Sequence, residues 1–349
     1  MEKNANRKPK ILIIYTGGTI GMIEDPATQT LRPFDFSHLI DNVPKIKMLD
    51  YDIRHIQFNP PIDSSNMNPA HWQQIAEAIG KNYNEVDGFV VLHGTDTMAY
   101  TASALSFMLE HLRKPVIITG SQLPIGEVRT DGEENLITAL QIAAATDPVN
   151  GEPMVQEVAI LFENYLWRGN RSTKMSADNF NAFKSNNYPP LAKIGLSIHF
   201  NPDSLWRVND PHPLNVHTGL NTDIIIIYVT PGLTEASLRQ QLETPGVKGG
   251  VLKTYGAGNA PTEPWFNNAI REAVDRGTII LNVTQCVNGA VHQKRYYTGD
   301  LLARAGVISG HDLTTEAALT KLMFLFGSGL SSAQVSRRLL HPICGEMTI

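Results

Sequence analysis

The chain has 349 residues and a formal net charge of −5. This length exceeds what one hydrophobic core usually serves, so we expect two domains. The charge balance is mild and basic residues are not interleaved with aromatic ones, so nothing indicates a nucleic-acid partner.

The start of the chain and its cysteines bear on location. The apolar run 11–15 is far too short for the core of a signal peptide or for a membrane span. The two cysteines, Cys286 and Cys344, are fewer than a secreted, disulfide-stabilised chain of this length would carry. We therefore predict a cytoplasmic protein with reduced thiols and no membrane partner. The histidine spacings match no zinc motif, and we predict no metal and no cofactor.

Along the first part of the chain, apolar runs of strand length alternate with segments of helical period. This alternation is typical of parallel sheets covered by helices. We predict strands at 10–15, 52–58, 88–93, 116–119 and 157–162, and helices at 71–83, 97–112 and 131–145.

The stretch 201–222 is crowded with Asn, Asp, Pro and His, which favours an exposed connection. Four consecutive isoleucines follow, and they favour a strand buried on both faces. The second part of the chain is predicted to hold strands at 223–229, 250–255 and 278–283, and helices at 235–242, 264–276, 315–326 and 331–340.

The predicted fold class is α/β. A larger N-terminal domain at 1–205 contains a mainly parallel sheet flanked by helices. A linker at 206–222 leads to a smaller C-terminal α/β domain with a parallel sheet at 223–349.

The segment YTGGTIGM follows the first predicted strand, and its glycines allow an unusual backbone path from which Thr19 projects. Ligands of open α/β sheets bind at the carboxyl ends of strands. Taken alone, the glycines could equally serve only a tight bend. A nucleotide loop fits less well, because the spacing is not the dinucleotide fingerprint and no lysine follows.

The segment HGTDTM repeats this arrangement, with Thr95 and Asp96 in a turn between a buried strand and a helix. Either residue could simply be a helix N-cap. The functional interpretation is that two strand ends in one domain present hydroxyls, and that Asp96 adds a carboxylate able to bind a substrate ammonium.

Two further segments offer polar groups. Asp63, Ser64 and Ser65, in PIDSSNM, precede a predicted helix, where hydroxyls and free N–H groups can bind a carboxylate. The alternative is an ordinary turn or cap. Lys174 ends the polar segment RGNRSTK. It is either a solvated loop lysine or, if buried beside a hydroxyl, a group that loses affinity for its proton and acts as a base.

These segments, with LHGTDTMAYTASALSFML, GSQLPIGEVRTDGEENL, TYGAGNAP and LNVTQC, resemble the bacterial type I, cytoplasmic L-asparaginases. The resemblance covers almost the whole chain. It is to the asparaginase and glutaminase family, whose members use a threonine as nucleophile. It implies hydrolysis of L-asparagine to L-aspartate and ammonia without a cofactor. It also implies a homotetramer, built as a dimer of dimers.

The resemblance implies a role for each candidate. Thr19 matches the nucleophile that attacks the side-chain amide and forms an acyl-threonine, with the oxyanion held by backbone donors near Thr95. Thr95, Asp96 and Lys174 match a second triad that positions or deprotonates water, and Asp96 also faces the substrate ammonium. The residues that match the binding positions for the α-carboxylate region are Asp63, Ser64 and Ser65.

The chain departs from the family pattern in two places. Many relatives place a tyrosine in the mobile loop after the nucleophile, but 22–34 contains none. Thr28, Thr30, an ordered water, Tyr15 or another segment could substitute. The loop itself is either a lid that closes over the site or an ordinary exposed surface loop. Secreted relatives borrow an acid from a neighbouring subunit, but 290–298 has none. Asp96 or a partner group near Asn259 would then bind the ammonium.

Cytoplasmic members can carry a second, regulatory asparagine site. Thr173, Thr284 and Cys286 match its positions. The alternative for Cys286 is a small buried apolar residue at a strand end.

Two other functions compete with hydrolysis. An asparaginase-like component of a tRNA amidotransferase would carry an added N-terminal domain, whereas about ten polar residues precede the first predicted strand. A non-catalytic asparagine-binding regulator would explain the missing loop tyrosine. The presence of Thr19, Thr95, Asp96 and Lys174 opposes it.

Overall fold

The computed structural model describes residues 7–24, 31–33, 43–208 and 212–349, and for 23, 24 and 31–33 it describes the backbone alone. The chain forms two compact units. The first is Met1–Ser185 with Pro189–Thr218, and the second is Asn186–Tyr188 with Gly219–Ile349. Each unit has its own mainly or wholly parallel sheet, which confirms the predicted fold class. The sequence-based limits at 205 and 223 stay a prediction.

The first unit contains a sheet of eight described strands in the order β13-β12-β9-β8-β7-β5-β1-β4. Neighbours from β4 to β8 are parallel, and the pairs from β8 to β13 are antiparallel. The five predicted strands are β1, β4, β5, β7 and β8. The bounds are β1 (Lys10–Gly17), β4 (Asp52–Ile62), β5 (Gly88–Leu92), β7 (Val116–Thr119), β8 (Val158–Phe162), β9 (Tyr165–Arg168), β12 (Ala192–Ile194) and β13 (Ile198–Phe200).

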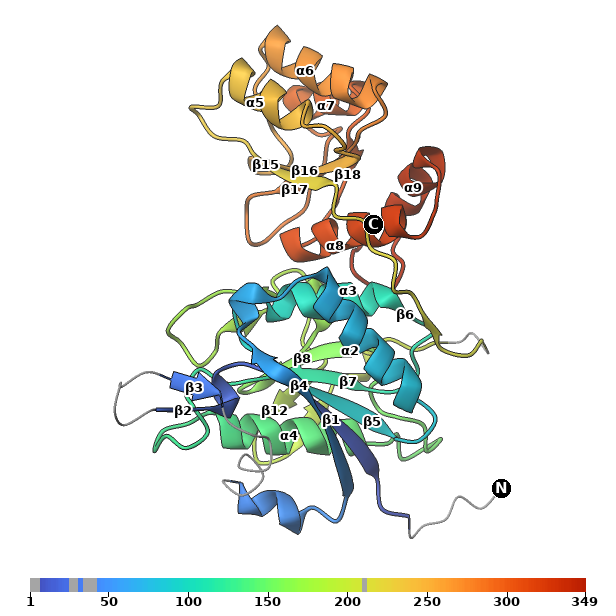
Figure 1. Ribbon diagram of the computed structural model, residues 1–349. Coiled ribbons are helices and arrows are strands. Elements are labelled where there is room, and N and C mark those ends of the chain that lie inside the picture. Colours follow the sequence, from blue (N-terminus) through green and yellow to red (C-terminus); the bar gives the residue numbers. More distant parts are fainter. Residues whose placement is uncertain (1–6, 25–30, 34–42, 209–211) are drawn as a thin grey trace. The chain divides into compact units, whose positions relative to one another are not determined.

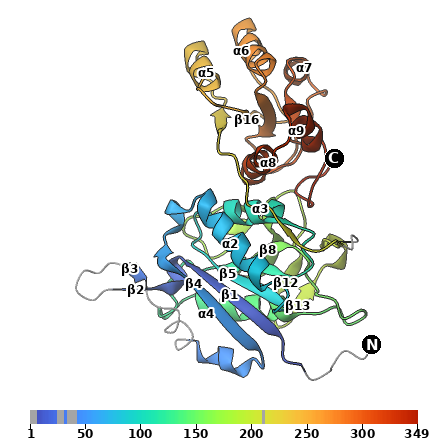
Figure 2. The same cartoon turned by 45° about the vertical axis from the view of Figure 1, so that its right-hand side comes forward.

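Helices cover both faces of this sheet. The helices α2 (Pro69–Asn82) and α3 (Met98–Met108) lie on one face, and α4 (Gly132–Ala144) lies on the other (Figures 1 and 2). Asn68 caps α2 by accepting backbone N–H groups, and two glutamates in the first turn of α4 complement its dipole. The parallel strands between these layers are buried on both faces, as β5 and β7 show throughout their length.

Short elements complete the unit. α3 ends at Met108, earlier than predicted, because Leu109 and Glu110 form a strand that pairs with Asn215 and Val216. The predicted linker is therefore not irregular throughout. These short elements are η1 (Thr19–Gly21), β2 (Met22–Glu24), β3 (Leu31–Pro33), η2 (Pro44–Met48), η3 (Ser64–Asn66), β6 (Leu109–Glu110), η4 (Gly169–Arg171), β10 (Thr173–Lys174), β11 (Phe183–Lys184), η5 (Pro202–Ser204) and β14 (Asn215–Val216).

The second unit contains a four-stranded parallel sheet in the order β15-β16-β17-β18. The helices α5 and α6 lie on one face and α8 on the other (Figure 1). The bounds are β15 (Ile224–Tyr228), α5 (Glu235–Leu242), β16 (Gly249–Thr254), α6 (Pro264–Asp275), β17 (Ile279–Thr284), α7 (Tyr297–Arg304), β18 (Ile308–Ser309), α8 (Thr315–Gly327) and α9 (Ser332–Leu339).

The isoleucine-rich strand β15 differs from its prediction. It is the edge of the sheet, with Ile227 buried but Ile226 and Tyr228 exposed by 39% and 55% within the chain. The prediction of a strand buried on both faces is wrong, because composition does not reveal which strand lacks a neighbour.

The segment RGNRSTK is not the exposed polar loop that its composition indicates. Arg168, Asn170, Arg171 and Ser172 are all buried. The Arg168 guanidinium contacts the Glu157 carboxylate through Nε at 2.6 Å. Charges are tolerated inside a protein when they are paired in this way.

A buried polar chain connects β5 to α3 and α2. The Trp72 indole donates to the Thr101 hydroxyl at 2.9 Å, and Thr101 lies 2.8 Å from Nε2 of His93. The other ring nitrogen of His93 lies 2.6 Å from the Gly94 carbonyl oxygen. Burial lowers the pKa of His93 to about 4, although its contact with the Gly94 carbonyl opposes this shift.

A fully buried ion pair holds the C-terminal residues to α8. Lys321 Nζ lies 2.7 Å from Glu346 Oε1, and both side chains are 0% exposed. Lys321 also donates to the His341 carbonyl, and Glu346 accepts the N–H groups of Ile343 and Cys344. No helix in the described part of the chain is both long and apolar enough to cross a membrane.

Acidification should destabilise the protein through His93. Its folded pKa of about 4 lies below the usual 6.5, so the unfolded state binds more protons between these pH values. This contribution to stability is complete above pH 6.5 and is lost as the pH falls towards 4, at up to about 1.4 kcal/mol per pH unit. Urea unfolding across this range should show a steeper loss for the wild type than for His93→Asn. Parallel curves would contradict the assignment.

Breaking the buried ion pair should be costly. Glu346→Gln leaves the Lys321 ammonium uncompensated and should lower the free energy of unfolding by about 3–5 kcal/mol. The exposed pair of Lys81 and Glu77 provides the control, since Glu77→Gln should cost less than about 1 kcal/mol. Urea titration monitored by circular dichroism measures both. Equal effects of the two substitutions would refute the argument.

Candidate active site

The loops that carry the candidate residues follow three adjacent strands, β5, β1 and β4. These strands are parallel, so their carboxyl ends meet at one edge of the sheet. The loop 17–21 follows β1, the loop 62–66 ends β4, and the loop 93–97 follows β5. Topology alone therefore brings the three sequence-predicted segments to one place.

Two glycines allow these loops to touch. A Cβ added to Gly18, where φ is 92°, would lie only 2.4 Å from the backbone nitrogen of Gly94. A Cβ added to Gly94 would lie 2.5 Å from the Ser64 hydroxyl oxygen. Any larger residue at either position would separate the loops. The glycines thus do more than permit a bend.

Thr19 is the first residue of η1 and is partly buried. No hydrogen bond to its hydroxyl occurs within the described part of the chain. The turn is closed by the Gly21 N–H, which donates to the Gly18 carbonyl at 3.1 Å. Thr19 therefore sits directly after the residue that contacts Gly94.

Thr95, Asp96 and Lys174 form one hydrogen-bonded cluster. Lys174 Nζ donates to Thr95 Oγ1 at 2.9 Å and to Asp96 Oδ1 at 2.8 Å. Thr95 is 8% exposed and the Lys174 side chain 21%, whereas the Asp96 side chain is 62% exposed. An ammonium is thus held between a buried hydroxyl and an accessible carboxylate, and Lys174 is not a solvated loop lysine.

The third loop is organised by its own hydrogen bonds. Asp63 caps η3, and its carboxylate accepts from both the N–H and the hydroxyl of Ser65 at 2.9 Å. The Ser64 carbonyl accepts from the Thr97 hydroxyl at 2.7 Å. Asp63 and Ser65 are exposed and Ser64 is buried. The cap role weighed from sequence is therefore present, and it leaves Asp63 and Ser65 accessible.

Gln122 joins the cluster, although its sequence context assigned it no role. The Thr95 hydroxyl donates to Gln122 Oε1 at 3.3 Å, and Gln122 Nε2 donates to the carbonyls of Ala177 and Asn179. The Asp131 carboxylate accepts the Gln122 N–H at 3.0 Å, and burial raises the pKa of Asp131. The signal that could have found Gln122 was its place shortly after a buried strand, in GSQLPIG.

Of the substitutes for a loop tyrosine, Tyr15 is fully buried and its phenol donates to the Gly21 carbonyl at 3.0 Å. Burial raises the pKa of Tyr15 to about 12, so the phenol stays protonated at neutral pH. It is poorly suited to take the proton of Thr19. Thr28 and Thr30 lie outside the described residues.

The residues expected at a regulatory site lie in different units. Thr173 belongs to β10 in the first unit, and Thr284 ends β17 in the second. The Thr284 hydroxyl accepts the Cys286 N–H at 3.0 Å. Cys286 is exposed, so its interpretation as a buried apolar residue is wrong. Asn259 accepts from the Thr298 hydroxyl at 2.7 Å.

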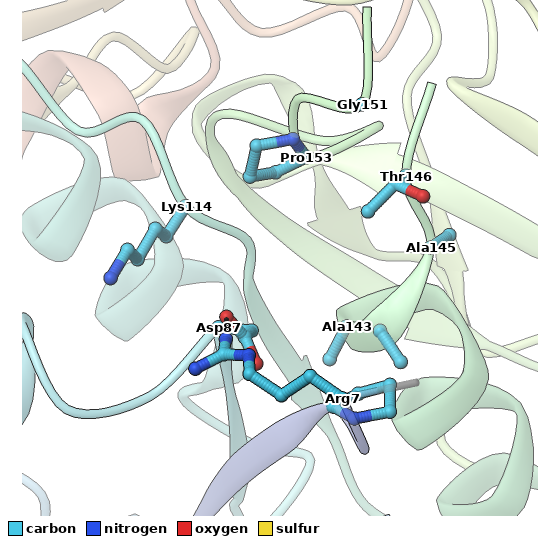
Figure 3. A pocket seen from close by; sticks show the side chains of 10 residues that line it. Arg7, Asp87, Lys114, Ala143, Ala145, Thr146, Gly151 and Pro153 are labelled. Atoms are coloured by element: carbon cyan, nitrogen blue, oxygen red, sulfur yellow. Dashed lines mark hydrogen bonds and ion pairs between the residues drawn. The ribbon is translucent and has the colours of Figure 1, made fainter. Parts of the chain in front are cut away.

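A hollow of about 530 Å³ lies beside the residues that precede β1, β5 and β7, at the ends of these strands opposite to the candidate residues (Figure 3). Its cations have partners within the fold. Arg7 pairs with Asp87, and Lys114 donates to the carbonyls of Tyr83 and Val86. The charged side chains that line this hollow are thus held by the fold, whereas the cluster at the carboxyl ends of the strands includes an accessible carboxylate.

Comparisons with known proteins identify relatives of this chain. The family model of the N-terminal asparaginase domain matches residues 10–205, and that of the glutaminase/asparaginase C-terminal domain matches 223–339. L-asparaginase 1 of Escherichia coli K12 is 43% identical, covering 98% of this chain and 99% of that protein. The crystal structure of L-asparaginase I from Vibrio cholerae is 41% identical with a TM-score of 0.89, covering 98% and 100%.

A third relative is named for another function. It is a component of the glutamyl-tRNA(Gln) amidotransferase of Pyrococcus furiosus and is 35% identical, covering 97% of this chain and 77% of that protein. The two family models together account for most of the chain, and the relatives above match nearly all of it. The chain belongs to the asparaginase family.

Proposed function

We propose that the protein is an L-asparagine amidohydrolase, which releases L-aspartate and ammonia through an acyl-threonine intermediate. The observation that carries this proposal is the hydrogen-bonded cluster of Thr95, Asp96 and Lys174, next to the loop of Thr19. The 43% identity to an L-asparaginase over nearly the whole chain supports the reaction class. It exceeds the 35% identity to the amidotransferase component.

In this proposal, Thr19 Oγ1 attacks the side-chain amide carbon of asparagine. The resulting oxyanion accepts hydrogen bonds from backbone N–H groups near Thr95. Its collapse breaks the C–N bond, and ammonia leaves with the proton that Thr19 gave up. Water then attacks the ester, assisted by Thr95 and Lys174, and aspartate is released. Asp96 binds the substrate ammonium, which its exposure allows.

Asp63, Ser64 and Ser65 would bind the α-carboxylate region of the substrate. The accessible Ser65 hydroxyl and the helix start of α2 nearby support this role. Asp63 holds Ser65 by two hydrogen bonds, so its own part is to order the loop as well as to contact the substrate.

Assembly, regulation and location are part of the same proposal. A homotetramer built as a dimer of dimers rests on the family resemblance. So does a regulatory asparagine site at Thr173, Thr284 and Cys286. A cytoplasmic location is supported by both cysteines being free thiols.

Removing either threonine hydroxyl should abolish turnover. Thr19→Ala and Thr95→Ala should each lower kcat for L-asparagine by at least about a thousandfold, because the proposal assigns each hydroxyl a direct part in the reaction. Ammonia release against asparagine concentration measures this, with glutamine and D-asparagine alongside. Thr244→Ala, at an exposed threonine of the second unit, is the matched control.

The same assay tests the competing function. If the wild type binds asparagine saturably but releases ammonia from no substrate, the hydrolase proposal is rejected and a non-catalytic asparagine-binding regulator is supported. A sigmoidal dependence of the wild-type rate on asparagine would support the regulatory site.

Lys174 should matter for rate more than for binding. Lys174→Met removes the ammonium from Thr95 and should lower kcat on the order of a hundredfold. Lys174→Arg should recover little, because a guanidinium differs in shape and holds its proton. The control is Lys184→Met, an exposed lysine on the paired strand β11. Activity of Lys174→Met within twofold of the wild type would remove Lys174 from the mechanism.

A further inference from the structure

The buried ring of His93 has a defined tautomer. The Gly94 carbonyl oxygen can only accept a hydrogen bond, so Nδ1 of His93, 2.6 Å away, must carry the proton. The ring is neutral near pH 7, because burial lowers the pKa of His93 to about 4. In a neutral imidazole with a proton on Nδ1, Nε2 is an acceptor.

The other partners fit this tautomer. The Trp72 indole N–H can only donate, and it donates to the Thr101 hydroxyl. Thr101 is then free to donate its own proton to Nε2 of His93. Each member of the chain from Trp72 to Gly94 therefore has one consistent donor and acceptor assignment.

The contact with His93 fixes the peptide group that joins Gly94 and Thr95. In a trans peptide the carbonyl oxygen and the N–H point in opposite directions. Since the Gly94 oxygen is held towards a ring that is 0% exposed, the Thr95 N–H points away from it. Within the described residues, this N–H donates to no protein group, although Thr95 itself is 8% exposed.

The unpaired N–H lies beside the loop of the proposed nucleophile. Gly18, the residue before Thr19, approaches Gly94 so closely that no Cβ fits between them. A nearly buried N–H without a partner is costly unless a ligand supplies an acceptor. An oxyanion formed next to Thr19 is an acceptor of the required charge.

We propose that His93 is a positioning residue for the reaction: its Nδ1–H holds the Gly94 carbonyl, and so aims the Thr95 N–H at the developing oxyanion. This inference rests on the proposed amidohydrolase function and adds to it a defined donor and the side chain that orients it. His93 touches neither substrate nor reacting atoms. Its effect passes through the 94–95 peptide.

The test compares His93→Leu, which lacks a donor, with His93→Asn, whose side-chain N–H can replace Nδ1–H. We expect His93→Leu to lower kcat about tenfold to a hundredfold with KM within twofold, since the donor acts mainly on the transition state. His93→Asn should recover kcat to within about threefold of the wild type. Thr101→Ser, which keeps the hydroxyl, is the control and should leave both constants unchanged.

Thermal unfolding of each variant distinguishes a positioning role of His93 from a packing role. If His93 served only packing, its substitution would lower stability, and His93→Asn would not recover kcat. If His93→Leu does not fold, His93→Gln replaces it, since that longer amide reaches towards Thr101 rather than back to Gly94. The inference is overturned if the variant without a donor to Gly94, His93→Leu or its replacement His93→Gln, keeps kcat within twofold of the wild type. Equal impairment of this variant and of His93→Asn also overturns it. An inactive wild type would instead overturn the proposed function.

Discussion

The candidate site depends on the contact between the backbones of Gly18 and Gly94. It joins the loop after β1 to the loop after β5 at a distance that excludes any side chain. Ser64 packs against the same glycine, so a third loop is included. Because rigid, buried strands carry these loops, the polar groups are held in place before any substrate binds. Hydrogen bonds within the loops then orient individual donor groups, as the contact of His93 with the Gly94 carbonyl orients the Thr95 N–H.

Much of this fold could be predicted from sequence because buried parallel strands have a strong signature. β1, β5 and β7 each contain an uninterrupted apolar run, and α2 and α4 show helical period and N-terminal signals. The short strands β9 and β12 were missed, since a few residues carry no period. The exposure of β15 was missed for another reason. Edge position is a property of the whole sheet, whereas composition is local.

The candidate residues differ in how they could be predicted from the sequence. Glycine turns after strands identified Thr19, Thr95 and Asp96, whereas Lys174 stayed open between a solvated lysine and a base until the family resemblance gave it a role. Gln122 escaped both, because its importance arises from a contact with Thr95 across 27 positions of sequence. His93 has no role that its motif alone reveals, since only the folded chain shows the partner of each ring nitrogen. Tertiary contacts of this kind leave no local pattern.

The pairing of Arg168 with Glu157 shows that one sequence motif can combine residues with two different roles. Arg168 opens the segment that ends in Lys174, yet it donates to the Ser204 carbonyl and Glu157 accepts the Trp206 N–H. It anchors a distant stretch of chain. Loss of activity in a variant of Arg168 would thus indicate a failure of folding rather than of chemistry. The role of a residue in a shared motif should therefore be judged from its contacts in the fold.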